Sequence, residues 1–119
     1  MIDGEIGPYG VPVISLRIDG RDWSAVIDTG FSGDLRLSDE LLSVVDARYI
    51  GEVRSFLAGG QVIDKDNYRV WFPFDGRTVL AEATFVGGFE ILIGTRFFKR
   101  YRLEIHFPKR TVQLKRSSQ

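Results

Sequence analysis

The sequence contains no cysteine and a single histidine, His106, among its 119 residues. Without cysteine the chain can form no disulfide, no thiol nucleophile and no cysteine-ligated zinc site. One histidine also excludes a histidine-rich metal site within one chain. Within the alternating segment 103–107, His106 shares the polar phase with Glu104, which predicts a surface imidazole rather than a catalytic one. We therefore expect chemistry that uses neither a metal nor a cofactor.

The sequence also lacks net charge, since 16 basic residues balance 16 acidic ones. No long-range attraction to nucleic acid is therefore expected. Basic residues do gather late in the chain, with Glu104 as their only acidic neighbour. They are Arg96, Lys99, Arg100, Arg102, Lys109, Arg110, Lys115 and Arg116. A solvated strand edge explains this cluster better than a nucleic-acid site, which would bind tightly and weaken steeply with salt.

Long apolar runs are missing as well. No run approaches the roughly 20 residues that would cross a bilayer. The start of the chain, 1–5, has neither the basic residues nor the apolar core of a signal peptide. We therefore expect a cytoplasmic protein with no membrane partner. The length suits one hydrophobic core, so we expect a single domain over 1–119.

The most informative stretch is 25–30, an aliphatic run that ends in Asp28, Thr29 and Gly30. Its valine and isoleucine suit a buried strand, and Gly30 lets the backbone turn sharply behind the acid. A carboxylate at the end of a rigid strand is held in place by packing, as a catalytic carboxylate must be. The same residues also fit a strand that ends in an ordinary polar turn. The triplet alone leaves both interpretations open.

The rest of the sequence has the pattern of short strands joined by glycine-rich turns. Strands are expected over 11–19, 23–27, 34–37, 49–58, 61–72, 78–86, 91–94, 103–107 and 111–114, with a polar interruption at 64–67. Two short helices are expected, one from the cap Ser38 to about Ala47 and one over 95–101 capped by Thr95. The pattern predicts an all-β, barrel-like domain with one or two short helices.

Strands 49–58 and 61–72 form a long hairpin whose tip carries Gly59 and Gly60. Few bulky side chains anchor this tip, as expected for a mobile cover over a site. An ordinary surface hairpin would show the same pattern. After the hairpin, the aliphatic strand 91–94 ends in a glycine, as the strand before Asp28 does.

This order of features resembles the single-lobed, retropepsin-like aspartic proteases over nearly the whole chain. The small prokaryotic members have similar motifs at three places. Here these places read Met-Ile-Asp-Gly at 1–4, Asp-Thr-Gly-Phe-Ser-Gly-Asp-Leu-Arg-Leu at 28–37 and Leu-Ala-Gly-Gly at 57–60. The resemblance implies a retropepsin-like acid-protease barrel whose single lobe forms a C2 homodimer.

The resemblance also implies roles for particular residues. Asp28 would be the catalytic acid, Thr29 would hydrogen-bond across the two-fold axis, and Gly30 would permit the turn. The substrate-binding residues would be Phe31, Ala58, Gly59, Gly60, Gln61 and Ile93, of which 58–61 form the tip of a flap over an extended peptide.

The sequence departs from the retroviral pattern at two positions. Phe31 follows the triplet, so no hydroxyl is available there to support the outer carboxylate oxygen. Thr95 replaces the arginine that follows the late glycine, although Arg96 comes next and offers a pairing with Asp34. The plausible walls of the cleft are Phe31, Leu35, Ile91 and Ile93, which suggests an apolar preference around the cut.

One aspartate is not sufficient for this chemistry, which uses two carboxylates roughly 3 Å apart that share one proton. The chain carries a single Asp-Thr-Gly, so two subunits must each bring Asp28 to the symmetry axis. The expected function is that of a homodimeric aspartic endopeptidase acting on peptides or unfolded segments. The alternative is a dimeric, non-catalytic module that binds a peptide or protein on the same fold.

Overall fold

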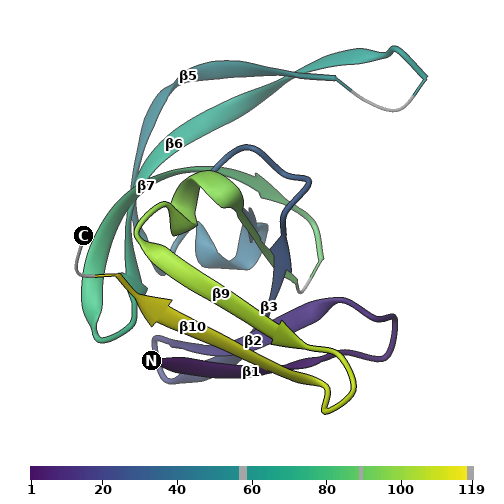
Figure 1. Cartoon of the computed structure of the whole chain (residues 1–119). Coiled ribbons are helices and arrows are strands. Elements are labelled where there is room, and N and C mark those ends of the chain that lie inside the picture. Colours follow the sequence, from purple (N-terminus) through teal and green to yellow (C-terminus); the bar gives the residue numbers. More distant parts are fainter. Residues whose placement is uncertain (57–58, 89, 118–119) are drawn as a thin grey trace.

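The computed structural model describes residues 1–56, 59–88 and 90–117, and most of them lie in β-strands (Figure 1). The strands are β1 (Ile2–Ile6), β2 (Pro12–Ile18), β3 (Arg21–Asp28), β4 (Leu35–Ser38), β5 (Asp46–Phe56), β6 (Val62–Phe74), β7 (Arg77–Val86), β8 (Ile91–Gly94), β9 (Tyr101–His106) and β10 (Thr111–Arg116). Two short 3₁₀ helices, η1 (Asp39–Leu41) and η2 (Thr95–Phe98), follow β4 and β8. The predicted all-β class with short helices is confirmed.

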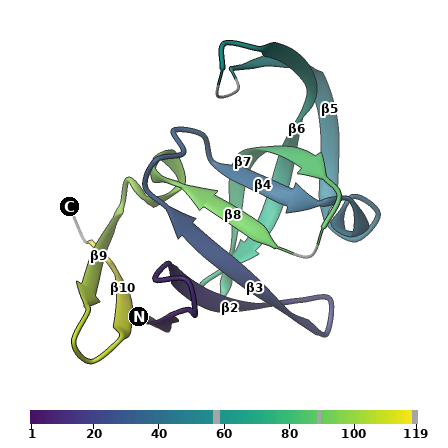
Figure 2. The same ribbon diagram turned by 90° about the vertical axis from the view of Figure 1, so that its right-hand side faces the viewer.

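The strands form one curled sheet in the order β5-β6-β7-β4-β8-β3-β2-β1-β10-β9. Figure 2 shows β8 between β4 and β3, strands that are far from it in the sequence. β8 runs parallel to β3 and antiparallel to β4. Because parallel strands end at the same edge, Asp28 lies opposite Gly94. The aliphatic strand before Asp28 and the aliphatic strand that ends in Gly94 therefore lie side by side.

The core is made by the inward phase of alternating strands. In β3, Trp23, Ala25 and Ile27 are buried, so the period of two brings Asp28 out of the core phase at the strand end. The largest fully buried side chains are Phe72, Ile14, Leu35, Leu37, Leu41, Ile91, Ile93 and Leu114. They come from both halves of the sheet, so one core holds the strands on both sides of Asp28 in place.

Tight turns follow the sequence expectation. The turn between β6 and β7 has positive φ at both Asp75 (55°) and Gly76 (73°), which a two-residue hairpin of type I′ requires. The long β5–β6 hairpin arches over the rest of the barrel, as Figure 1 shows at the top of the view. No residue of β5 is buried, so little apolar packing holds this edge strand.

The two predicted helices are shorter than expected. Ser38 does cap η1, because its hydroxyl accepts from the Glu40 N–H at 3.3 Å, but the helix stops at Leu41 and β5 begins at Asp46. In η2 the cap position is taken by Gly94 with no side-chain hydrogen bond, so the predicted Thr95 cap is wrong. Segments this short gain few helical hydrogen bonds, and β-branched residues near Val45 favour the extended chain.

Two strand predictions also need correction. β6 runs without a break through 64–67, because these polar residues pair in register with β5 on an exposed hairpin. β1 was not predicted, since Asp3, Gly4 and Glu5 give it a weak apolar pattern. Backbone hydrogen bonds to β2 on one side and to β10 on the other hold β1 in the sheet. The predicted strand end at Ala58 lies outside the described residues.

Candidate active site

Asp28 is the last residue of β3 and is partly buried. Its Oδ1 accepts a hydrogen bond from the Gly30 N–H at 2.9 Å, and its carbonyl accepts one from the Phe31 N–H at 3.1 Å. Backbone hydrogen bonds and the β3–β8 ladder therefore orient the carboxylate. The sequence produces this turn because a short acidic side chain is followed two residues later by an unhindered glycine.

Backbone contacts from β8 support the loop behind Asp28. The Gly94 N–H donates to the Asp34 carbonyl at 2.9 Å, and the Thr95 N–H donates to the Phe31 carbonyl at 3.0 Å. A Cβ built on Gly94 would overlap the Gly33 carbonyl and lie 2.6 Å from the Phe31 carbonyl. The close approach of loop and strand therefore requires glycine at position 94.

Phe31, the unusual residue after the triplet, is part of this packing. A Cβ on Gly33 would lie 2.8 Å from two atoms of the Phe31 ring, and one on Gly94 would lie 2.9 Å from another. The ring therefore rests on the two glycines while it stays partly exposed. The apolar ring of Phe31 thus packs between the loop and the end of β8.

A hollow of about 220 Å³ lies on one side of the Asp28 carboxylate. Its lining is mostly apolar and consists of Ile27, Asp28, Thr29, Thr95, Phe98 and Leu103. Thr29 is exposed beside this hollow, and its hydroxyl has no hydrogen bond to any side chain or backbone group among the described residues. Among the described residues, the central threonine of the triplet therefore has no hydrogen-bond partner, and its hydroxyl can bond to another molecule.

A larger groove of about 540 Å³ is lined by Gly30 and the residues after it on one side and by residues of the β5–β6 hairpin on the other. Three neighbouring strands supply its floor with Arg36, Thr84 and Leu92, which are cross-strand partners in the sheet. The hairpin contributes Lys65 and residues 53–56 from the part of its strands near the tip. Asp28 and Thr29 line the hollow and Gly30 lines the groove, so the Asp-Thr-Gly turn contributes to both.

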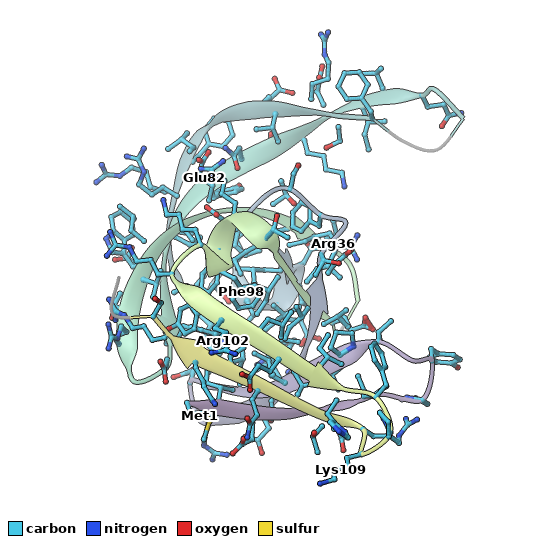
Figure 3. The ribbon with its side chains drawn as sticks, viewed as in Figure 1. Met1, Arg36, Glu82, Phe98, Arg102 and Lys109 are labelled. Carbon is cyan, nitrogen blue, oxygen red and sulfur yellow. The ribbon has the colours of Figure 1, made fainter. Side chains whose placement is uncertain are left out.

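A polar network holds one wall of the groove together. The Arg96 side chain lies 3.5 Å from Asp34 Oδ1 and also donates to Glu82, so the predicted pairing of Arg96 with Asp34 is confirmed. Glu82 accepts at 2.8 Å from the buried Asn67 amide, and its backbone N–H donates to Asp34 Oδ2 at 2.9 Å. Figure 3 shows Glu82 beneath the hairpin. The network joins the active-site loop to β6, β7 and η2.

Hydrogen bonds from Asn67 and Arg96 lower the pKa of Glu82 from its ordinary value of 4.5. A carboxylate with a lowered pKa stabilises the folded state above pH 4.5 and loses this contribution as the pH falls through the lowered pKa. We expect Glu82→Gln to keep the Asn67 contact and to lower the free energy of unfolding by about 0.2–1 kcal/mol at pH 7, because the pair is partly exposed.

Urea unfolding of wild type and Glu82→Gln at pH 7 and at pH 3 measures this contribution. The difference between the two proteins should shrink at the lower pH, because pH 3 lies below the ordinary pKa of 4.5 and the unfolded chain then takes up the proton. The Asp22→Asn variant, which removes a carboxylate from an exposed ion pair with Arg17 that belongs to neither the network nor the groove, is the control. A Glu82→Gln effect that is equal at both pH values would contradict a role for the charge.

The structure separates the predicted substrate-binding residues into two groups. Phe31 lines the groove, whereas Ile93 is fully buried at 0% exposure and faces the core. Ile91 is equally buried, so neither isoleucine forms a wall, and Leu92 between them faces the groove instead. The alternation of β8 explains this correction, since successive side chains point to opposite faces.

The predicted flap tip does not line the groove. Gly59, Gly60 and Gln61 are exposed at the end of the hairpin, and both glycines have positive φ (92° and 86°). Ala58 lies outside the described residues. Residues 53–56 of β5 and Lys65 of β6, which pair close to the tip, line the groove instead.

Sequence reasoning missed Arg36, Asn67 and Glu82. A strand pattern with a polar residue between Leu35 and Leu37 was a signal for Arg36, because such a residue must lie on the opposite face from the core. Asn67 and Glu82 gave no such signal. Their meeting depends on the β6–β7 pairing and on contacts with the loop after Asp28, which are far apart in the sequence.

No group of three or more His, Asp or Glu side chains within 1–56, 59–88 and 90–117 is arranged to hold a metal ion. In the same part of the chain, no helix has the length and apolar character needed to cross a membrane.

The fold resembles solved structures of proteases. A crystal structure of a retropepsin-like aspartic protease from Rickettsia conorii matches 95% of this chain and 88% of its own, with a TM-score of 0.65 and 17% identity. A foamy viral protease–reverse transcriptase, solved with an RNA/DNA hybrid, matches 81% of this chain with a TM-score of 0.60 and 19% identity. The match spans only 13% of that longer viral chain.

No family model and no curated protein sequence matches the chain. At identities below one fifth, the structural likeness establishes the fold. The chain therefore has the retropepsin-like aspartic protease fold.

Proposed function

We propose that residues 1–119 form one domain that acts as a homodimeric aspartic endopeptidase. The observation that supports this most is the placement of Asp28. Its carboxylate lies at the end of a buried strand, is oriented by the Gly30 N–H at 2.9 Å, and lines the hollow, while Gly30 two residues later lines the groove. The fold is similar to that of aspartic proteases, and a carboxylate at this place is the group that their chemistry needs.

The reaction requires a second Asp28 from a partner subunit. With two carboxylates roughly 3 Å apart, like-charge repulsion keeps one of them protonated. The ionised Asp28 takes a proton from water as the water oxygen attacks the peptide carbonyl carbon, and the protonated Asp28 donates its proton to the carbonyl oxygen. The resulting diol then collapses: the protonated Asp28 gives its proton to the leaving nitrogen, the C–N bond breaks, and the ionised Asp28 takes a proton from one diol hydroxyl, which leaves a carboxylic acid and an amine.

The surroundings of Thr29 support the dimer. Thr29 is exposed beside a hollow that includes Ile27, Phe98 and Leu103. A second copy related by a two-fold axis would cover this apolar surface and receive the hydroxyl of Thr29. The active site is incomplete without that copy, because each chain contributes one catalytic carboxylate.

The groove supports an extended peptide as the substrate. Its floor is a sheet face and its cover is a hairpin whose outer strand β5 has no buried residue. A peptide in this space would be held by backbone hydrogen bonds in the manner of an added strand, with side-chain contacts along the groove. The exposed tip residues 59–61 would close over the peptide as a flap.

Cleavage that needs two subunits should depend on protein concentration in a characteristic way. We expect the specific activity on an unbiased peptide library at pH 4 to 7 to fall when the protein is diluted below its dimer dissociation constant. Sedimentation of the same samples gives the dimer fraction, and activity should follow it. Cleavage that stays constant per chain while the protein sediments as a monomer would remove the shared-carboxylate mechanism.

A dimeric, non-catalytic peptide-binding module remains the second candidate. The packing of Phe31 where related proteases place a hydroxyl favours it, because the outer carboxylate oxygen then lacks that donor. A dimer that binds library peptides but cleaves none of them across the pH range would identify this function.

A further inference from the structure

We propose that Arg36 makes the groove selective for peptides that carry an aspartate or glutamate side chain, an inference that rests on the proposed function. Arg36 is then a specificity-determining residue of the substrate site. The preference differs from the apolar one that the sequence suggested, and it follows from three observations on the groove.

The first observation is the position of Arg36 in β4. Leu35 and Leu37 on either side are buried at 1% and 0% exposure, so the strand directs Arg36 to the opposite face. That face is the floor of the groove, where Arg36 lies next to Thr84 and Leu92. In Figure 3, Arg36 is labelled at the right of the view and Glu82, which also lines the groove, at the left.

The second observation is that the Arg36 guanidinium lacks a partner among the described residues. Its Nε is buried and makes no hydrogen bond in the structure that residues 1–56, 59–88 and 90–117 describe. The side chain forms no ion pair with these residues either. An unpaired buried donor of this kind is costly, and charged donors cost more than neutral ones. A ligand that accepts from Nε would remove that cost.

The third observation is the charge balance of the groove. Its charged lining residues are Arg36, Arg54, Lys65, Arg96, Asp34 and Glu82. Both carboxylates are engaged by Arg96, and Arg54 lies 3.6 Å from the Asp64 carboxylate outside the groove. This leaves Arg36 on the floor and Lys65 above it as two cations without an acidic partner in the described structure.

A carboxylate fits these two cations best. The planar guanidinium of arginine binds a carboxylate through two parallel hydrogen bonds, one of which Nε can donate. An amide or an apolar side chain would leave at least one charge of the groove uncompensated. A peptide with a Glu or Asp side chain over Arg36 satisfies the buried Nε and places a negative charge below Lys65.

The test separates binding from cleavage by using the Asp28→Asn protein. The probes are fluorescein-labelled peptide pools of random sequence that differ only in a central Glu, Gln or Lys, and anisotropy gives each dissociation constant. We expect the Glu pool to bind about tenfold more tightly than the Gln pool, and this difference to decrease at high salt. Arg36→Gln should abolish the difference, and Arg36→Glu should shift the preference to a central Lys.

Arg48→Gln is the matched control, because Arg48 is exposed on β5 outside the groove. It should leave the tenfold preference unchanged. Equal binding of the Glu and Gln pools by a folded protein would overturn the inference, as would a preference that survives Arg36→Gln. Displacement of the Glu pool by an equal concentration of single-stranded oligonucleotide would also overturn it, since the groove would then bind phosphates.

The outcomes for the inference and for the proposed function are distinguishable. An Arg36-dependent preference for Glu without cleavage by the wild type would support selective binding and contradict the protease. Cleavage by the wild type with no Glu preference on either side of the cut would support the protease and contradict the role of Arg36.

Discussion

The Asp28→Asn variant is expected to lose peptide cleavage by at least about 1000-fold while its fold and assembly stay intact. Asparagine cannot hold the shared proton or remove one from water, so both the acid and the base of the dyad are lost. The amide oxygen can still accept the hydrogen bond that Gly30 N–H gives to Asp28 Oδ1 at 2.9 Å. The loop should therefore keep its shape, and cleavage of the peptide library is the measurement.

Asp22→Asn is the matched control for this experiment. It removes a carboxylate from the same strand, but Asp22 pairs with Arg17 and its side chain is 69% exposed. We expect full cleavage and almost unchanged stability for this variant. If Asp28→Asn kept more than a small fraction of wild-type activity, another group would have to perform the chemistry, and the proposed mechanism would be wrong.

Mixed dimers extend the same expectation to the two-subunit site. When wild type and Asp28→Asn exchange subunits at equal concentrations, random pairing leaves about one quarter of the dimers with two aspartates. Activity should fall towards that fraction of an all-wild-type sample at the same total concentration. Activity that falls only to one half would mean that each chain carries a complete site of its own.

The parts of the fold that depend on local pattern were predictable from the sequence. Alternation located most strands, and glycine with a preceding acid located the turns at 19–20 and 75–76, where positive φ is required. The triplet and the late aliphatic strand were recognised separately. Their meeting, with Asp28 opposite Gly94, depends on a crossover that places β8 between β3 and β4.

The parts that were not predictable depend on which strands become neighbours. The sequence predicts Ile93 as a wall residue because a run of aliphatic residues does not show which of them face the core. The register with β3 and β4 decides this: Ile93 faces the core and Leu92 faces the groove. The same holds for Arg36, whose surroundings come from β7 and β8. Residue type predicted the chemistry of Asp28, while tertiary pairing decided the lining of the groove.

Gly94→Ala is expected to lower the free energy of unfolding by about 3 kcal/mol or more and to abolish cleavage. A Cβ at this position would overlap the carbonyl of Gly33 and lie 2.6 Å from that of Phe31, both of which belong to backbone. Relief requires the loop and β8 to separate. That movement breaks the hydrogen bonds from Gly94 N–H to Asp34 and from Thr95 N–H to Phe31, and with them the support of Asp28.

Gly87→Ala is the control, because a Cβ on Gly87 meets only the Asp39 carboxylate at 4.0 Å. Its φ is outside the range that favours glycine, so we expect a stability change within about 1 kcal/mol, in the stabilising direction where alanine restricts the unfolded chain. Urea unfolding of both variants beside the wild type measures the contrast. If Gly94→Ala unfolds at the wild-type urea concentration and still cleaves peptides, the loop behind Asp28 must move without disturbing the carboxylate. The tight packing of β8 against the loop would then not be what positions Asp28 for catalysis.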